Sequence, residues 1–404
     1  MVQPERRTRA DILAATAITA AVAAIAALIW WNSDARATTS RPATTPAANP
    51  PTAAHVPAAL KQLWSAPSPT TRVPVAVGGT VVTGDRHRVD GRDRVTGQAL
   101  WSYSRGSDLC GVSWVHQYAV AVYRDDRGCG QVSTIDGSTG RRGPTRSSYA
   151  DAAVQLSANG ATVLSAGATR LEMWRSDLVR MIVYGETDAR VKPPARGLHS
   201  GCTLESAAAS STQVSVLESC ADQADLRLLL LHPGKDDDEP KQQVVPQPGV
   251  PRGAGARVLA VSQERTAVYL PGPQPRVEVI DDTGTTVSST ALAGQPSHSA
   301  AVSRAGDLVT WWTGNSLMVF DAAGLTLRYT IAAGETTQPL GPATMMAGQL
   351  LVPVTDAIGV YDPASGEAVR YLEVQRQPVD APVVPAVVGS QVIEQRGDTM
   401  VALG

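Results

Sequence analysis

The sequence predicts an all-β fold: a single closed β-propeller of four-stranded blades, carried on an N-terminal transmembrane helix. Two observations predict the propeller. Strand-like segments recur along the chain at intervals of about 40 to 55 residues, which is the period of four-stranded blades. In addition, the first strand of the repeat region stands alone, and the last repeat lacks its final strand. We expect eight blades, with seven as the alternative.

Residues 73–101 give the clearest view of the repeated unit. Apolar residues alternate from residue 73 to residue 77, two glycines follow, and residues 80–83 are a β-branched run. A Thr-Gly turn then precedes a strand that ends at Leu100-Trp101. Alternating apolar residues interrupted by glycine turns indicate short antiparallel strands and leave no room for helices.

Degraded copies of this unit follow along the chain. They lie at residues 132–140, 171–178, 226–234, 277–284, 317–324 and 358–366. Several have an aspartate at one position of the repeat, namely Asp136, Asp281, Asp321 and Asp362. We interpret these aspartates as turn residues that bond their own backbone rather than as a binding site.

The two ends of the repeat region complete each other. Residues 382–404 supply the inner strands of one more blade and stop where its outer strand should begin. Residues 60–64 end in Leu-Trp, as residues 73–101 do, but have no strands in front of them. We therefore expect the N-terminal strand to complete the C-terminal blade, which removes exposed sheet edges.

Composition limits the function classes. The 404 residues include 35 basic and 37 acidic side chains, a formal charge of −2, which argues against a general nucleic-acid binder. A repeat array can use about 340 residues as one closed body. We expect a monomer.

Residues 12–32 carry no charge and are long enough to cross the ~30 Å hydrocarbon layer. Arg6, Arg7 and Arg9 precede them, so residues 1–11 are expected in the cytoplasm and the rest of the chain outside. A cleaved signal peptide is the alternative, since Ala35-Arg-Ala37 resembles a cleavage site. We favour an uncleaved anchor in the inner membrane, with the C-terminal domain in the periplasm.

Residues 33–58 are rich in Ala, Thr and Pro. Such a segment is expected to be an extended, semi-stiff linker that holds the propeller, residues 59–404, away from the membrane.

The chain has four cysteines. Cys110 and Cys129 are 19 residues apart, and Cys202 and Cys220 are 18 apart. In each pair the first cysteine opens a strand and the second closes the next, so we predict the bridges 110–129 and 202–220. Each would stabilise the fold by roughly 3 kcal/mol on a chain-entropy estimate. No histidine or C-x-x-C spacing supports a metal site.

Catalytic patterns are missing from the sequence. The six histidines are scattered, and neither H-E-x-x-H, G-x-S-x-G nor a phosphate loop occurs. The acidic run at residues 235–239 lacks the spacing of an EF-hand and fits a solvated turn. We therefore expect a protein that is not an enzyme and has no cofactor.

Two apolar pairs are candidates for a binding surface. Trp311 and Trp312 point to opposite faces of one strand, so at least one belongs to the core. Met345 and Met346 present the same alternative. Core packing is the favoured interpretation for both pairs, while Trp311, Trp312 and Met345 are the residues we would test for contact with a lipid or a partner protein.

The pattern Val-x-(x)-x-Asp-x-x-(Ser/Thr)-Gly-x-x-Leu-Trp, seen at residues 89–101, 132–140 and 360–366, resembles the PQQ-type propeller repeat. That repeat occurs in quinoprotein dehydrogenases and in the envelope lipoprotein that assists outer-membrane protein assembly. The repeat specifies a fold and not a chemistry. The chain has no vicinal Cys-Cys pair and no recognisable quinone and calcium ligands.

The start of the chain resembles a narrower family. Residues 6–11, the Ala-rich apolar stretch ending at residues 28–37, and the single exported propeller are similar to the mycobacterial polar growth factor family. This resemblance implies a periplasmic propeller that binds trehalose monomycolate, a mycolyl glycolipid, and works beside the mycolate flippase, an inner-membrane lipid transporter at the growing pole. The alternatives are a protein-assembly scaffold without a lipid ligand and an exported quinone-dependent dehydrogenase.

Overall fold

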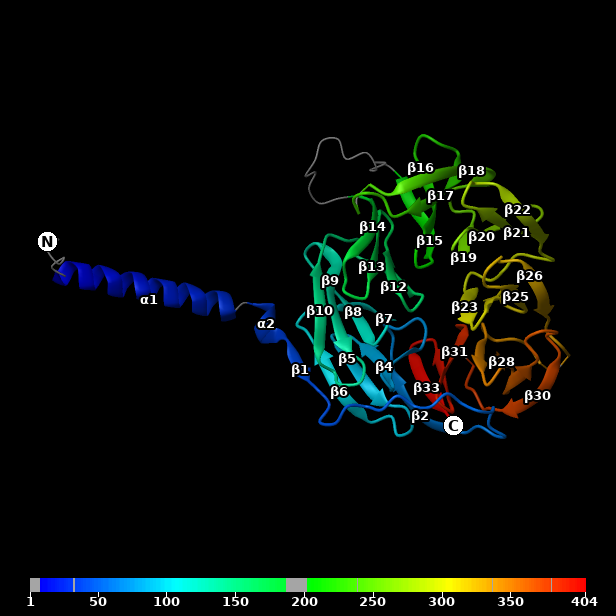
Figure 1. The fold of residues 1–404 in the computed structure, drawn as a ribbon, viewed down its shortest axis with the longest axis horizontal. Coiled ribbons are helices and arrows are strands. Elements are labelled where there is room, and N and C mark those ends of the chain that lie inside the picture. The colour runs from blue at the N-terminus through cyan, green and yellow to red at the C-terminus, as the bar shows by residue number, and fades with distance from the viewer. Residues whose placement is uncertain (1–7, 32, 187–201, 238, 336, 379) are drawn as a thin grey trace.

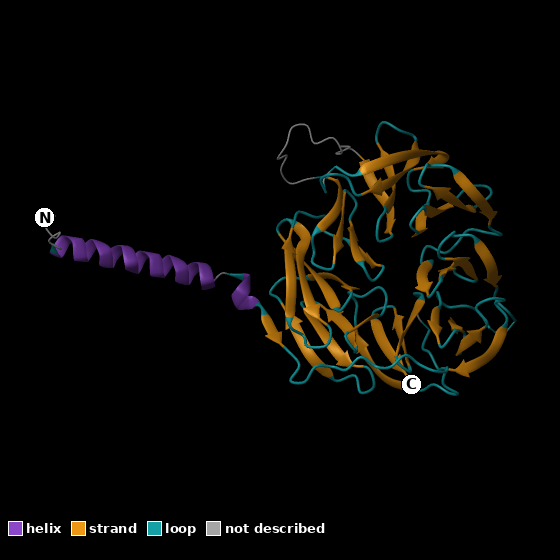
Figure 2. Ribbon diagram, in the orientation of Figure 1, coloured by secondary structure: helices purple, strands orange, loops and turns teal. Residues whose placement is uncertain are grey.

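The computed structural model describes residues 8–31, 33–186, 202–237, 239–335, 337–378 and 380–404. Its main body is a ring of eight sheets around a common axis, and one helix extends away from the rim of the ring (Figure 1). Strands make up nearly all of the ordered elements (Figure 2). The prediction of an eight-bladed propeller is confirmed.

Each blade is an antiparallel sheet whose strands follow one another from the axis to the rim. Blades 1 to 4 consist of β3 (Val75–Val77), β4 (Thr80–Asp85), β5 (Arg88–Asp93) and β6 (Ala99–Ser104); β7 (Leu109–Val115), β8 (Tyr118–Asp125), β9 (Gly128–Asp136) and β10 (Arg142–Ser147); β11 (Gln155–Ala158), β12 (Thr162–Ala166), β13 (Arg170–Arg175) and β14 (Arg180–Gly185); and β15 (Cys202–Ala209), β16 (Val214–Cys220), β17 (Asp225–His232) and β18 (Lys241–Pro251). Blades 5 to 8 consist of β19 (Arg257–Val261), β20 (Arg265–Leu270), β21 (Arg276–Asp281) and β22 (Thr286–Ala291); β23 (Ala301–Ala305), β24 (Leu308–Trp312), β25 (Leu317–Asp321) and β26 (Leu327–Ile331); β27 (Thr344–Met346), β28 (Gln349–Val354), β29 (Ala357–Tyr361) and β30 (Ala368–Glu373); and β31 (Val383–Val388), β32 (Gln391–Arg396), β33 (Thr399–Leu403) and β2 (Gln62–Pro67).

The hydrophobic core lies between the blades. The buried apolar side chains of the described residues form clusters that each join two neighbouring blades, all the way round the ring. Successive residues of a strand point to opposite faces of its sheet, so one strand packs on both neighbours. In β24, for example, Trp311 packs toward blade 5 and Trp312 toward blade 7. This arrangement explains why the inner strands are apolar on both faces.

The aspartate, glycine and tryptophan that recur at fixed spacing in this chain's repeat pack neighbouring blades together. Trp101, on the outer strand of blade 1, lies against Gly140 in a turn of blade 2, and its Nε1 donates to the Gly137 carbonyl at 2.7 Å. A Cβ at Gly140 would lie 2.3 Å from the Trp101 Cβ, and the φ of this glycine is +69°. Equivalent pairs are Trp64 with Gly97 and Tyr329 with Gly366. The repeat motif therefore docks each of these blades onto the next.

The aspartate of the same turn fixes the turn itself. Asp136 Oδ1 accepts hydrogen bonds from the backbone amides of Ser138 and Thr139, at 3.1 and 2.9 Å. Burial would raise the pKa of this carboxyl, but the hydroxyls and amides of the two residues hold it below its ordinary value. Asp281, Asp321 and Asp362 make equivalent turn bonds. The interpretation of these aspartates as turn residues is confirmed.

The N-terminal strand closes the ring as expected. β2 pairs antiparallel with β33, with Ser65 opposite Val401, and becomes the outer strand of blade 8. Trp64 is buried against blade 1. The first and last strands of the propeller thus belong to one sheet, and neither terminus leaves an open blade.

The segment between the helix and β2 differs from the predicted free linker. β1 (Thr39–Arg41) pairs with β6 as a fifth strand of blade 1, with Thr39 opposite Ser104. The chain then crosses the turns of blades 2, 1 and 8: Ala43 and Ala47 donate backbone hydrogen bonds to Thr139 and Ser138 at 2.9 and 2.8 Å. We call residues 39–60 the strap.

The strap ends by burying two apolar side chains. Val56 and Leu60 belong to the cluster between blades 7 and 8, and Arg370 donates to the carbonyls of Val56 and Pro57. The Ala/Thr/Pro composition predicted an extended linker, because it offers few large apolar side chains for a core. An extended chain can nevertheless bind through its backbone groups, and Val56 and Leu60 fix the end of the strap. Residues 39–60 are therefore bound along the propeller instead of forming a separate spacer.

The N-terminal helix α1 (Arg9–Trp31) is long and apolar enough to cross a membrane. It begins three residues before the predicted span, and a short helix α2 (Asp34–Ala37) follows. All α1 side chains are exposed in this structure. Arg6, Arg7 and Asn32 lie outside the described residues.

Both predicted disulfides are present, Cys110–Cys129 and Cys202–Cys220. Cys202 and Cys220 lie opposite each other on the adjacent strands β15 and β16, as predicted. Cys129 instead lies on β9, the third strand of its blade, because residues 118–125 alone form the second strand. That bridge therefore ties the first strand of blade 2 to the third.

Candidate functional site

The ring has two unlike faces. Because the strands alternate in direction, the turns after the first and third strands of every blade lie on one face, which the strap crosses. The turns after the second strands and the links between blades lie on the opposite face, which we call the link face. The longest described links are residues 292–300, 332–343 and 374–382, and all three join blades 5 to 8.

A cavity of about 510 Å³ opens among these links. This volume is within the usual range for small-molecule sites. Its lining residues come from the three links, from the turn between β28 and β29, and from the ends of β24 and β31; they are Ser299, Trp312, Leu340, Thr355, Asp356, Arg376, Gln377, Pro378, Asp380, Ala381 and Val383.

The cavity wall is held by backbone hydrogen bonds. The Leu340 amide donates to the Pro353 carbonyl at 2.8 Å, and the Leu340 carbonyl accepts from the Val383 amide at 2.9 Å. The Thr355 amide donates to the Gln338 carbonyl at 3.0 Å. The link before β27 is thereby fixed to blade 7 on one side and blade 8 on the other.

A buried ion-pair network supports the opposite wall. Arg376 Nη2 lies 2.7 Å from Glu394 Oε1, and Arg376 Nη1 donates to the carbonyls of Val354 and Ala357, both at 2.8 Å. Arg396 contacts the other oxygen of Glu394 at 2.6 Å. The Glu394 side chain is fully buried and that of Arg376 is 4% exposed. Arg376 is thus a fixed part of the wall whose guanidinium is already occupied.

The remaining lining residues divide into an apolar and a polar group. Trp312 is 8% exposed, and its Nε1 donates inward to the Pro339 carbonyl at 2.8 Å. Asp356 and Asp380 are exposed carboxylates at the rim. Hydroxyl, amide and carboxylate groups beside an apolar wall suit a ligand that has several hydroxyl groups and an apolar part.

The cavity lining combines two hydroxyl residues with two aspartates. Among the described residues that line the cavity there is no histidine, cysteine or lysine. Its two hydroxyl residues, Ser299 and Thr355, therefore lack a histidine or lysine base within the lining.

The structure separates the three residues singled out from the sequence. Trp311 is 1% exposed and packs on Tyr269, with ring centroids 5.6 Å apart, so it is core and not a contact surface. Trp312 is mostly core as well but lines the cavity. Met345 is half-buried between blades 6 and 7 and is not part of the cavity lining. Of the three candidates, only Trp312 lies at the candidate site.

Sequence reasoning missed Asp356, Arg376 and Asp380. The signal that could have found them is the length of the links, since short links close a propeller face tightly and long ones leave room for a cavity. Arg376 and Asp380 lie within such a link, residues 374–382.

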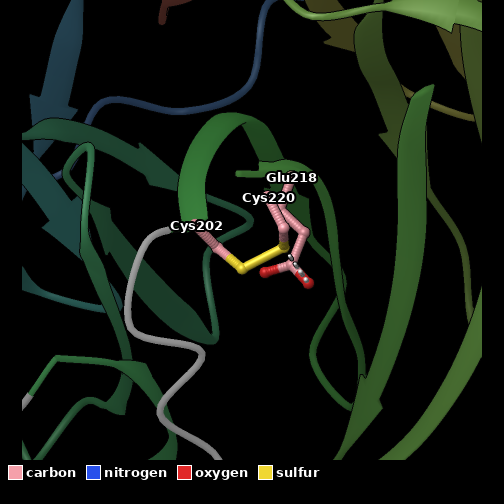
Figure 3. A group of neighbouring side chains, drawn as sticks. All are labelled: Cys202, Glu218 and Cys220. Carbon is pink, nitrogen blue, oxygen red and sulfur yellow. Dashed lines mark hydrogen bonds between the residues drawn. A yellow bond between two sulfur atoms is a disulfide. The ribbon is translucent and has the colours of Figure 1, made fainter. Parts of the chain in front are cut away.

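A second cluster combines Cys202, Cys220 and Glu218 (Figure 3). Both sulfurs are joined in the disulfide, and the Glu218 carboxylate accepts from Arg227 Nε at 2.5 Å and from the Tyr184 hydroxyl at 2.8 Å. Burial, reinforced by Glu218, raises the pKa of the Tyr184 hydroxyl. All three groups have structural partners, so we assign the cluster to the stability of blades 3 and 4.

A third cluster surrounds Glu172 on β13. Its carboxylate contacts Arg170 at 2.5 Å and Arg146 at 3.3 Å, and it accepts from Trp174 Nε1 at 2.8 Å. Burial would raise the pKa of Glu172, but Arg170 and Arg146 hold it below its ordinary value. Arg180, a further neighbour of Glu172, also pairs with Asp237 at 2.6 Å. Within the acidic run at residues 235–239, Asp237 therefore contacts blade 3, while Lys235, Asp236 and Glu239 are exposed, as a solvated turn predicts; Asp238 lies outside the described residues.

Solved structures resemble the propeller. The C-terminal WD40 domain of Sif2 superposes with a TM-score of 0.54 at 11% identity, covering 87% of this chain and 99% of that one. The likeness concerns the fold alone. BamB from Moraxella catarrhalis has a TM-score of 0.48 at 14% identity, with coverage of 85% and 99%. The dihydro-heme d1 dehydrogenase NirN in complex with DHE has a TM-score of 0.47 at 14% identity, with coverage of 75% and 66%.

No protein-family model and no curated protein matches the chain.

Proposed function

We propose that this chain is a membrane-anchored extracytoplasmic propeller that acts in cell-envelope biogenesis as a binding protein and not as an enzyme. The observation that carries the proposal is the cavity on the link face, with an apolar wall and two exposed carboxylates. The apolar helix α1 and the two disulfides support a location outside the cytoplasm.

The ligand we propose is a mycolyl glycolipid, trehalose monomycolate, handled together with an inner-membrane lipid transporter. The resemblance of the N-terminal region to the polar growth factor family suggests this ligand. The chemistry of the cavity is compatible with it, since Asp356 and Asp380 can accept hydrogen bonds from sugar hydroxyls while Trp312 and Leu340 offer apolar contact. The volume of about 510 Å³ suits the sugar headgroup and the first part of an acyl chain, not a whole mycolate.

A binding titration tests the proposal. The full chain in lipid nanodiscs is titrated with trehalose monomycolate and, separately, with trehalose. We expect Asp356→Asn together with Asp380→Asn to weaken glycolipid binding about tenfold or more, because hydrogen bonds to charged acceptors contribute about 1.5 kcal/mol each.

Asp282→Asn is the matched control, since Asp282 is an exposed aspartate in a turn of blade 5, outside the cavity lining. It should leave the affinity unchanged. Absence of glycolipid binding by the unmodified chain, or equal affinities for both variants, would contradict the proposed site.

A further inference from the structure

We propose that the rim of blades 1 and 2 binds the anionic phospholipid surface of the membrane that holds α1, so that the propeller stands on this rim. This inference rests on the anchor role proposed for α1. It adds a second interaction surface, separate from the cavity on the link face.

The first support is the place where the chain joins the ring. The strap fixes the chain to blade 1 from Thr39 onward, where β1 pairs with β6. Only residues 32–38 lie between the end of α1 and Thr39. Seven residues span at most about 25 Å when fully extended, and part of this segment is the helix α2. The outer strands β6 and β10 lie beside this junction (Figure 1).

The second support is an uneven distribution of charge. Residues 32–41 and 75–147, which contain the junction and blades 1 and 2, have 12 basic and 8 acidic residues, whereas residues 148–404 have 18 basic and 27 acidic residues. The nearly neutral total of the chain conceals this difference. The basic part of the propeller is the part next to the anchor.

Exposure strengthens the contrast. Among the described residues, exposed basic side chains outnumber exposed acidic ones by eight to three in the basic part, and are outnumbered by fifteen to seven in residues 148–404. Several acids of blades 1 and 2 are already used within the fold: Asp90 pairs with Arg88 and Arg92, and Asp136 fixes its turn. The exposed arginines include Arg41 in the strap and Arg141 and Arg142 in blade 2.

The electrostatic attraction between the rim and the lipid surface depends on the distance between them. A basic residue near an anionic lipid surface is attracted to it, and this attraction decays within a Debye length of about 8 Å at physiological salt. The short junction keeps the rim within reach of the surface, so a modest attraction suffices to orient the ring. The acidic blades opposite would be repelled.

Energy transfer in proteoliposomes tests this orientation. The native cysteines leave no free thiol, so a donor dye can be placed at Thr145→Cys on β10 or at Ser289→Cys on β22, across the ring. The full chain is reconstituted with an acceptor-labelled lipid in phosphatidylcholine vesicles, with or without about 30% phosphatidylglycerol.

We expect stronger transfer from position 145 than from 289, a rise at 145 when phosphatidylglycerol is present, and its reversal by 0.5 M NaCl, which shortens the Debye length to ~4 Å. Arg141→Glu with Arg142→Glu should abolish the rise. The control, Arg304→Glu with Arg328→Glu, reverses two exposed charges of blade 6 and should retain it.

The inference would be overturned by equal energy transfer from positions 145 and 289. It would also be overturned if transfer from position 145 did not change with lipid charge, with salt or with the Arg141→Glu, Arg142→Glu substitutions. The result is independent of the cavity, because glycolipid binding is measured with different variants. Intact mass of the reconstituted chain verifies that α1 is still attached.

Discussion

Gly140 illustrates how single residues determine this fold. It combines a left-handed backbone, φ +69°, with direct contact to the Trp101 indole of the preceding blade. Either feature alone excludes most side chains, and the two recur together at Gly97 and Gly366. The turn aspartates and these glycines recur at the same positions of the repeat, so the sequence alone could identify them. They recur because each is required by the backbone conformation of its own turn.

Gly140→Ala should lower the free energy of unfolding by roughly 3 kcal/mol, the sum of left-handed backbone strain and overpacking against Trp101. The control is Gly249→Ala, where φ is +76° but a Cβ would meet no atom within 4 Å. It should cost only about 1 kcal/mol. Denaturant unfolding of both variants decides the question, and equal losses would mean that interblade contact at the glycine is unimportant.

Asp136 makes the stability of its turn depend on pH. The pKa of Asp136 is lowered in the folded state. The charged carboxylate therefore adds to the free energy of unfolding above the unfolded-state pKa of about 3.9, and this stabilisation is lost as the pH falls through the folded-state pKa. Asp136→Asn keeps an acceptor oxygen without a titrating proton. The variant should be less stable than the unmodified chain at pH 7, and this difference should shrink toward pH 3.

Unfolding midpoints at pH 7 and pH 3 measure this effect. Asp126→Asn, at an exposed turn position of the same blade, is the control and should shift the midpoint equally at both pH values. A difference for Asp136→Asn that persists unchanged at pH 3 would contradict the role of the charged carboxylate in the turn.

At the scale of elements, strand β2 joins the two ends of the propeller. A chain that starts at Ser68 lacks β2 and leaves the edge of β33 open, and open edges promote association. We expect this truncated chain to form larger species in light scattering and to melt at a lower temperature. A chain that starts at Lys61 keeps β2 and is the control. Identical behaviour of the two chains would show that closure by β2 is dispensable.

The strap shows where sequence reasoning about elements fails. Its composition of Ala, Thr and Pro resembles that of an unattached linker, and its binding to the ring uses backbone groups and only two buried side chains, Val56 and Leu60. Backbone pairing leaves little trace in composition. By contrast, β2 was predictable because its Leu63-Trp64 pair repeats the Leu100-Trp101 pair of β6, although both pairs lie near the start of their strands and not at the end.

At the scale of the whole molecule, the number of blades and the closure of the ring follow from the repeat, because each blade buries its faces only against its neighbours. The cavity does not follow from the repeat. It forms where links from blades 5 to 8, distant in sequence, meet on one face, and the repeat motif carries no information about them. Trp311 was a poor candidate for the same reason: its partner Tyr269 belongs to another blade.

The two surfaces proposed here divide the ring by function. The basic rim of blades 1 and 2 lies next to the end of α1, while the cavity lies among blades 6 to 8 on the link face. With the rim on the membrane, the cavity would remain open to a ligand delivered from the bilayer or from a neighbouring transporter.

Native mass spectrometry of the full chain, purified in detergent from its own host, tests the central claim most directly. We predict a bound species whose released mass is that of a mycolyl glycolipid, and its loss in the Asp356→Asn, Asp380→Asn variant but not in Asp282→Asn. A ligand-free mass for the unmodified chain, or a lipid retained equally by both variants, would contradict the account of the propeller as a glycolipid-binding protein.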